Sequence, residues 1–141
     1  MAFRSGKDSW FALDNVAGTL TNLTSYIDTI GHPQTVETLD VSVMGTTAKQ
    51  FITGLTDGDS LTISGPYDPT IWTHLTAVKA AQALGSSTAT FTWGPGGSVA
   101  AQAKSSGECW LGTFEFSSGV AGRVEWTASL QVTGSITNTV W

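Results

Sequence analysis

The sequence predicts a mainly β domain: a β-sandwich or barrel-like sheet with one flanking helix at about 69–84 and a long inserted loop at about 31–50. Three observations predict this fold. Apolar and polar residues alternate strictly over 123–133, glycine-containing turns separate several such runs, and one segment has helical spacing. A length of 141 residues is typical of one domain, so we expect a single domain over 1–141.

The first element is a hairpin in residues 13–28, which read LDNVAGTLTNLTSYID. Two short runs of alternating apolar residues flank a turn at 15–18, where asparagine and glycine are typical turn residues. Almost nothing in this stretch is suited to chemistry. It therefore indicates a β domain that presents surfaces rather than converting a substrate.

Four further runs have the two-residue period of half-buried strands. Over 123–133 the apolar face holds Val124, Trp126, Ala128, Leu130 and Val132. Over 88–93 it holds Ala89, Phe91 and Trp93, and a shorter run alternates at Leu61 and Ile63. A further aromatic face is formed by Trp110, Phe114 and Phe116.

Turn signals lie between these runs, at 57–59, 94–97, 117–119 and 121–122. At such intervals they favour a sandwich or barrel, and we expect a hairpin turn at 57–59.

One segment departs from the β pattern and predicts a helix from Pro69 to Leu84. Asp68 suits the N-cap, Pro69 suits the first helical position, and Gly85 suits the stop. The expected buried face comprises Ile71, Leu75 and Val78, widened by Trp72 and Ala81.

The segment from Gly31 to Gln50 is polar at both ends and has a short strand-like core at Val41–Met44. A loop of this length inside a small domain is usually functional or mobile. We expect it either to be solvated or to dock on a neighbouring molecule.

Composition narrows the classes of function. Only 12% of residues are charged, whereas Ser and Thr number 37, and buried hydroxyls cost less than buried charges, which suits extensive protein–protein contact. The net charge is −5 and the six basic residues are scattered, so stable DNA binding is not expected. A single cysteine, Cys109, excludes an intramolecular disulfide, and no apolar run approaches membrane-spanning length.

The candidate chemical sites are weak. His32 and His74 lack cysteine or carboxylate partners at metal-ligand spacing, and the Asp57–Asp59 stretch does not follow a calcium loop. The glycines of 94–97 lack the Lys-Ser/Thr of a phosphate loop, and no nucleophile elbow is present. We expect no enzyme activity, no metal and no cofactor.

The six tryptophans divide into two groups. Trp72, Trp93 and Trp126 are expected in the core. The sequence pattern does not assign Trp10, Trp110 and Trp141 to the core. Exposed tryptophans either stack on sugar rings or anchor an interface.

Three motifs in order carry a family resemblance: the hairpin at 13–28, GLTDGDSLTISGPYDP at 54–69, and RVEWTASLQVTGSI at 123–136. Together they resemble the major tail protein, or tail tube protein, of long-tailed bacteriophages, over about 13–136. The resemblance implies a β-sandwich with a flanking helix, assembled as hexameric rings stacked into a hollow tube.

The resemblance also implies partners and a location. The partners are copies of the chain itself, together with tape measure, tail terminator and baseplate or initiator proteins. DNA passes through the lumen without stable binding, no membrane is involved, and the protein is made in the host cytoplasm and resides in the virion.

Carried onto this sequence, the resemblance makes 31–50 the assembly loop between rings, and 1–9 and 136–141 the terminal arms. The candidate subunit-interface residues are Phe3, Trp10, Pro33, Val41, Val43, Met44, Lys49, Phe51 and Trp141. Two alternatives stay open: a glycan-binding β-sandwich that uses Trp10 or Trp110, and the tube of another contractile or injection system.

Overall fold

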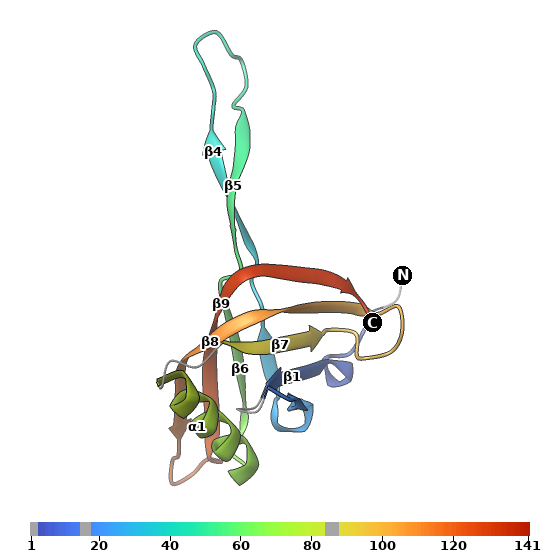
Figure 1. Ribbon diagram of the computed structural model, residues 1–141, viewed down its shortest axis with the longest axis vertical. Coiled ribbons are helices and arrows are strands. Elements are labelled where there is room, and N and C mark those ends of the chain that lie inside the picture. The colour runs from blue at the N-terminus through green and yellow to red at the C-terminus, as the bar shows by residue number, and fades with distance from the viewer. Residues whose placement is uncertain (1–2, 15–17, 84–87) are drawn as a thin grey trace.

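A computed structural model describes residues 3–14, 18–83 and 88–141, and confirms a mainly β fold with one α-helix (Figure 1). The elements in chain order are η1 (Gly6–Asp8), β1 (Trp10–Asp14), β2 (Leu20–Asn22), η2 (Thr24–Tyr26), β3 (Thr29–Gly31), β4 (Thr35–Asp40), β5 (Phe51–Asp57), β6 (Ser60–Pro66), α1 (Pro69–Ala83), β7 (Ala89–Gly94), β8 (Ala103–Ser117) and β9 (Glu125–Val140).

The body is one seven-stranded antiparallel sheet in the order β2-β1-β7-β8-β9-β6-β3. Its two edge strands are consecutive in the chain and are joined only by the linker 23–28. At one end of the linker the Leu23 N–H donates to the Phe11 carbonyl, and at the other the Asp28 N–H donates to the Ser64 carbonyl. The sheet therefore curls until its edges meet through this linker. Of the two predicted architectures, the barrel-like one applies.

The first hairpin is confirmed, because β1 and β2 pair antiparallel with Leu13 opposite Thr21. Its expected turn at 15–18 lies largely outside the described residues. After Asn22 the chain leaves the hairpin, so the second half of the 13–28 motif belongs to the linker and to its approach to β3 at the opposite sheet edge.

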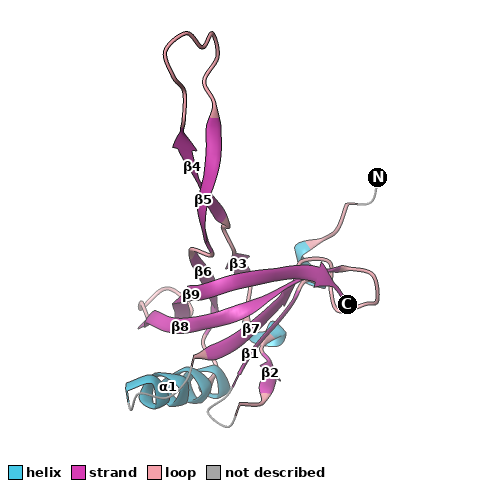
Figure 2. Cartoon of the chain, turned by 45° about the horizontal axis from the view of Figure 1, so that its top comes forward, coloured by secondary structure: helices cyan, strands magenta, loops and turns pink. Residues whose placement is uncertain are grey.

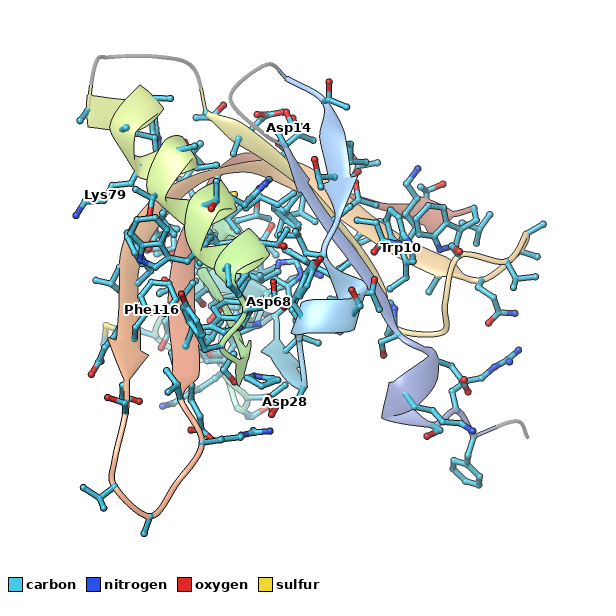
Figure 3. The ribbon with its side chains drawn as sticks, turned by 90° about the horizontal axis from the view of Figure 1, so that it is seen from below. Trp10, Asp14, Asp28, Asp68, Lys79 and Phe116 are labelled. Atoms are coloured by element: carbon cyan, nitrogen blue, oxygen red, sulfur yellow. The ribbon has the colours of Figure 1, made fainter. Side chains whose placement is uncertain are left out.

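The hydrophobic core fills the inside of the curled sheet and is closed by α1, which lies across the sheet (Figure 3). The predicted inner residues of β6 and β9 are buried: Leu61, Ile63, Trp126, Ala128, Leu130 and Val132. Val124 is 41% exposed, because β9 begins only at Glu125. In β7 Ala89 and Phe91 are buried and Trp93 is partly buried against the core.

A bulge in β8 corrects the predicted aromatic face. The β8–β9 register shifts between Leu111 and Thr113, so one extra residue, Gly112, reverses which side chains point inward. Phe114 and Phe116 pack against the core, whereas Trp110 lies opposite Gln131 on the outer face and is exposed. The prediction that Trp110 shares a face with them was wrong.

A side chain from α1 forms hydrogen bonds with the backbone N–H and carbonyl at this bulge. Gln82 accepts a hydrogen bond from the Leu111 N–H at 2.7 Å and donates one to the Leu111 carbonyl at 3.2 Å. The helix is thereby fixed to the sheet at the point where the ladder is irregular.

The helix itself matches its prediction at the start and on its buried face. Ile71, Leu75 and Val78 are buried. Trp72, expected to widen that face, is instead 47% exposed, because it lies about 100° around the helix from Ile71. Ala81 is partly buried. The helix ends at Ala83, and the predicted end at Leu84–Gly85 lies outside the described residues.

The N-cap leads to a first prediction. The Asp68 carboxylate accepts a hydrogen bond from the Thr70 N–H at 2.8 Å, so Asp68→Ala is expected to lower the free energy of unfolding by about 1 kcal/mol. Asp68→Asn is the matched control, since asparagine caps equally well. Urea unfolding measures both; equal losses in the two variants would show that charge rather than capping matters.

The stretch Asp57–Asp59 is not the hairpin turn expected from sequence. β5 pairs with β4, whereas β6 pairs with β3 and β9, so the stretch redirects the chain from one sheet into another. The Asp59 N–H donates to the Asp57 side chain at 2.8 Å, and Asp59 has a φ of 55°. At 94–97 the predicted turn is confirmed by a bond from the Gly97 N–H to the Gly94 carbonyl.

Residues 136–140 also differ from expectation, because they continue β9 instead of forming a separate arm. They pair with the start of β8, with Val140 opposite Ala103. Gly134, with a φ of 77°, marks the irregular point in the strand before this extension.

Candidate self-assembly surface

A two-stranded ribbon projects from the body and ends in an irregular loop (Figures 1 and 2). We call residues 35–57 the arm. It consists of β4, the loop 41–50 and β5, and nearly all of it is exposed. The segment 31–50 was expected to be solvated or to dock on a neighbouring molecule, and all of it except the partly buried His32 is exposed. The expected strand-like core at Val41–Met44 was wrong, because the strands are 35–40 and 51–57.

The arm has apolar side chains on both of its faces. Leu39 pairs with Ile52 on one face, and Phe51 pairs with Asp40 on the other. The exposed large apolar residues of the arm are Val36, Leu39, Val41, Val43, Met44, Phe51, Ile52 and Leu55. An isolated two-stranded hairpin is at best marginally stable in water, and apolar patches of this kind mark interaction sites. The arm is therefore an exposed apolar surface of the kind that binds another molecule.

Polar contacts fix the arm at its base. Gln34 and Asn138 form a reciprocal pair of amide hydrogen bonds at 2.9 and 3.3 Å. The Thr35 hydroxyl donates to the Asp59 carboxylate at 2.5 Å. These contacts connect the root of β4 to β9 and to the junction before β6. The direction in which the arm leaves the body is thus set by the sheet.

A second cluster of candidate residues lies on the body, where Trp10 meets Trp141. Their rings are edge to face with centroids 4.8 Å apart, and Lys104 Nζ lies 4.9 Å from the Trp141 ring centroid. The backbone N–H of Trp141 donates a hydrogen bond to the Gln102 carbonyl at 3.1 Å. Trp141 is therefore held by its own chain, and no free C-terminal arm is seen at 136–141.

A pocket of about 320 Å³ opens beside Trp10. Its lining is mainly aromatic and aliphatic, from β1, β3, β7 and the linker 23–28, with Lys7 and Asp28 as its charged members.

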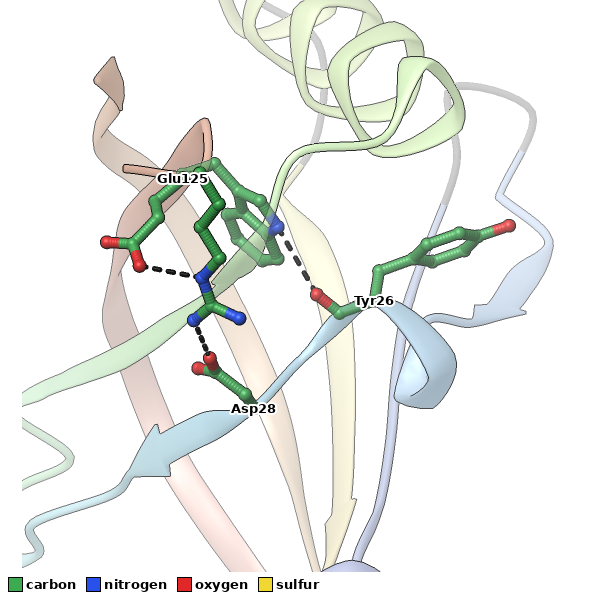
Figure 4. A network of polar contacts seen from close by, with 5 residues as sticks. Tyr26, Asp28 and Glu125 are labelled. Atoms are coloured by element: carbon green, nitrogen blue, oxygen red, sulfur yellow. Dashed lines mark hydrogen bonds and ion pairs between the residues drawn. The ribbon is translucent and has the colours of Figure 1, made fainter. Parts of the chain in front are cut away.

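An ion-pair network closes one side of this region (Figure 4). Arg123 contacts Asp28 at 2.5 Å and Glu125 at 2.8 Å, and these carboxylates raise the pKa of the guanidinium. Trp126 Nε1 donates to the Tyr26 carbonyl at 3.2 Å. The linker between the sheet edges is thus held from the start of β9.

The nine predicted interface residues divide into three places. Val41, Val43, Met44, Lys49 and Phe51 lie on the arm, with Pro33 just before it. Phe3 is exposed near the N-terminus, and Trp10 and Trp141 pair on the body. Sequence reasoning missed Leu39, Ile52 and Leu55, although the β-branched and aromatic residues of TVETLD and FITGL favour strands.

The structure offers little reactive chemistry. Within the described ranges no three His, Cys, Asp or Glu residues are grouped to hold a metal ion. Burial raises the pKa of the Cys109 thiol to about 12, which leaves it protonated and unreactive at neutral pH. No helix in the described part of the chain is long and apolar enough to cross a membrane.

The two histidines lead to a prediction on pH. Burial lowers the pKa of His32, whose ring is edge to face with Phe91, and burial also lowers that of His74 despite Asp14 nearby. The unfolded chain therefore binds more protons than the folded one below pH 6.5, so stability is full above that pH and is lost as the pH falls.

We expect the free energy of unfolding, measured with urea, to fall on acidification through this range. The double variant His32→Phe/His74→Leu should show a flatter dependence. An unchanged slope in the double variant would assign the effect to other groups.

Comparison with known proteins identifies solved structures that have this fold. No family model and no curated protein matches the sequence. Among solved structures, a chain from the tail of an empty gene transfer agent particle with C6 symmetry has a TM-score of 0.75 and 15% identity, covering 97% of this chain and 99% of that one. A chain from the SPP1 tail tube has a TM-score of 0.72 and 20% identity, covering 99% and 80%.

A chain from the sheath-tube complex of an extracellular contractile injection system is also similar, with a TM-score of 0.69 and 7% identity, covering 99% and 93%. These likenesses span nearly the whole chain, arm included. The curled sheet, its flanking helix and the projecting arm together are the fold found in phage tail tubes, as the sequence resemblance predicted.

Proposed function

We propose that the chain is a structural subunit that assembles with copies of itself into stacked rings, forming the tube of a phage-type tail. The observation that carries this proposal is the arm, an apolar two-stranded ribbon without cover, on a fold shared with tail tubes. A protein of this kind works by association and needs no active site, cofactor or metal.

The physics of the chain suits open-ended assembly. The arm is one surface and the body another, so contact between them is heterologous and can repeat without limit along an axis. The edge strands β2 and β3 have only three residues each, which limits uncontrolled edge pairing. Stable assemblies of this sort commonly bury ~2,000 Å² or more.

Within this proposal the arm, including the predicted assembly loop 31–50, contacts the next ring. The rings are hexameric, a number supported by the resemblance and by the C6 symmetry of the similar gene transfer agent tail. The nine candidate residues are assigned to subunit contacts, with Trp10 and Trp141 acting together. The N-terminal segment 1–9 is assigned to further contacts between subunits.

DNA passes through the lumen in this proposal, and the net charge of −5 disfavours its retention. Tape measure, terminator and baseplate or initiator proteins are the proposed tail partners, and the virion is the proposed location. The glycan-binding alternative, which would use Trp10 or Trp110, is not favoured, because the similar solved structures come from tails and tail tubes and because Trp10 already contacts Trp141.

Electron microscopy of the purified protein at rising concentration tests the proposal. We expect rings and tubes to form, with or without an initiator complex as a primer. A protein that stays monomeric at every concentration and with the primer would contradict it.

The tube of a contractile injection system is the second candidate, favoured by the likeness to the sheath-tube complex. Purified tails would separate the two: a tail without a sheath supports the first, and a sheathed tube that carries protein cargo supports the second.

A further inference from the structure

We propose that the pocket beside Trp10 receives the tip of the arm of a second copy in the adjacent ring, with Met44 inserted and Asp40 of the arm facing Lys7 of the pocket. The inference rests on the proposed function and deepens it, because it names both halves of the contact between rings.

The pocket has the shape and chemistry of a receptor for apolar side chains. Its volume is about 320 Å³, and part of its lining comprises Gly6, Lys7, Ser9, Thr24 and Asp28. The apolar part of the lining is supplied by Trp10, Phe11, Ile27, Ile30 and Trp93. None of these walls carries a catalytic or metal-binding group. Concave, mainly aromatic sites of this size bind a few side chains rather than a flat surface.

The arm tip supplies side chains that have nothing to bind in their own chain. Met44 is fully exposed, and Val43 is 68% exposed beside it. Methionine is flexible and fills irregular cavities well. A bond from the Thr46 hydroxyl to the Val43 carbonyl at 2.7 Å shapes the loop, so Val43 and Met44 are presented on an ordered turn.

Opposite charges on the pocket and on the arm favour this contact. Asp28 at the pocket is already paired with Arg123, which leaves Lys7 as the unpaired charge of the lining. On the arm, Asp40 accepts a bond from the Ser42 N–H at 2.8 Å, which lowers the pKa of its carboxyl and keeps it ionised. Within the described ranges neither Lys7 nor Asp40 has an ion-pair partner. The arm carries three carboxylates, Glu37, Asp40 and Asp57, and one cation, Lys49, so its net charge is negative and complements Lys7 of the pocket.

The arm tip and the pocket lie on separate parts of the chain. In Figure 1 the loop 41–50 lies at the far end of the arm, whereas the pocket is lined by residues of the body, from η1, β1, η2, β3, β7 and their neighbours. Figure 3 labels Trp10 and Asp28 of the pocket on the body. Because the projecting tip and the pocket are different surfaces of the same chain, a contact between them is heterologous and can repeat from one ring to the next.

The first test uses a substitution that blocks the pocket. A Cβ at Gly6, which lines the pocket, would meet no atom within 4 Å, so Gly6→Phe adds a ring beside the pocket without a clash at the Cβ. Gly119→Phe is the matched control, since Gly119 is equally unobstructed and lies outside the pocket. We expect Gly6→Phe to fold with an unchanged melting temperature but to form no tubes, while Gly119→Phe forms them.

Charge reversal is the second test, read as the critical concentration for tube growth by light scattering. Lys7→Glu and Asp40→Lys should each raise it about tenfold. The double variant Lys7→Glu/Asp40→Lys should return it to near the wild-type value, because every subunit then carries both reversed charges.

The outcomes separate the two proposals. If the wild-type chain forms tubes and Gly6→Phe forms them equally well, or if the double reversal does not restore growth, the docking site is wrong and the tube function stands. If the wild-type chain forms no tubes under any condition, the function itself is wrong.

Discussion

Replacing residues 41–50 by a two-residue Asn-Gly turn is expected to leave a folded protein that forms no tubes. Asp40 and Phe51 pair directly in the arm, so a tight type I′ turn can join them without changing the register. The exposed apolar residues of the arm are absent from the core cluster, so the body loses no buried contact. The replacement therefore removes only the proposed contact with another copy.

The melting temperature and electron micrographs together measure this result. We expect the shortened protein to melt within a few degrees of the wild type, and tubes to be missing at any concentration. A variant of unchanged length, Val43→Ser/Met44→Ser, separates loop length from apolar contact and should also assemble poorly. Normal tubes from the shortened protein would assign assembly to another surface.

The largest effect on stability is expected for Trp126→Ala, a loss of about 3–5 kcal/mol in the free energy of unfolding. Trp126 is 1% exposed and lies opposite Phe116 on one side and Gly65 on the other. Its removal leaves a large cavity and also leaves the Tyr26 carbonyl without its donor. Because the free energy of unfolding of a domain is only about 5–15 kcal/mol, this loss would remove a large part of it.

Trp72→Ala is the matched control, because Trp72 is the same residue type but is 47% exposed on α1. Its loss is expected to stay within about 1 kcal/mol. Urea unfolding measures both variants. Similar losses at the two positions would mean that the core is not organised around Trp126.

Where one local rule acts alone, the sequence was sufficient to predict the structure. β9 follows from strict alternation because one face is buried and the other is wet, and α1 starts at Pro69 because Asp68 caps it. The apolar spacing of Ile71, Leu75 and Val78 likewise predicted which face of the helix is buried.

Where the structure depends on contacts distant in the chain, local pattern failed. A single inserted residue at Gly112 moved Trp110 to the opposite face from Phe114, and no residue type signals such a bulge. Asp57–Asp59 has the composition of a hairpin turn, yet β5 and β6 belong to different sheets. Turn composition predicts a change of direction but not which strand pairs with which.

The candidate surface was predicted in part for the same reason. Residues of the 31–50 segment were recognised because the segment has too little apolar pattern to fit the body. The partner strand β5 was not predicted, although its first residue, Phe51, was a candidate interface residue; the structure shows Leu55 of this strand 82% exposed. The contact of Trp10 with Trp141 joins distant ends of the chain, which no local pattern reveals.

The continuity of β5 into β6 has a mechanical consequence. Tension applied to the arm passes through Asp57–Asp59 directly into β6, which is bonded to β9 at seven paired positions, Ser60–Pro66. Antiparallel hydrogen bonds lie perpendicular to their strands, so a pull along β6 shears them together instead of peeling them one at a time. A filament linked through such arms would carry longitudinal load on the backbone of β6 and β9, and would resist stretching better than one joined by surface loops.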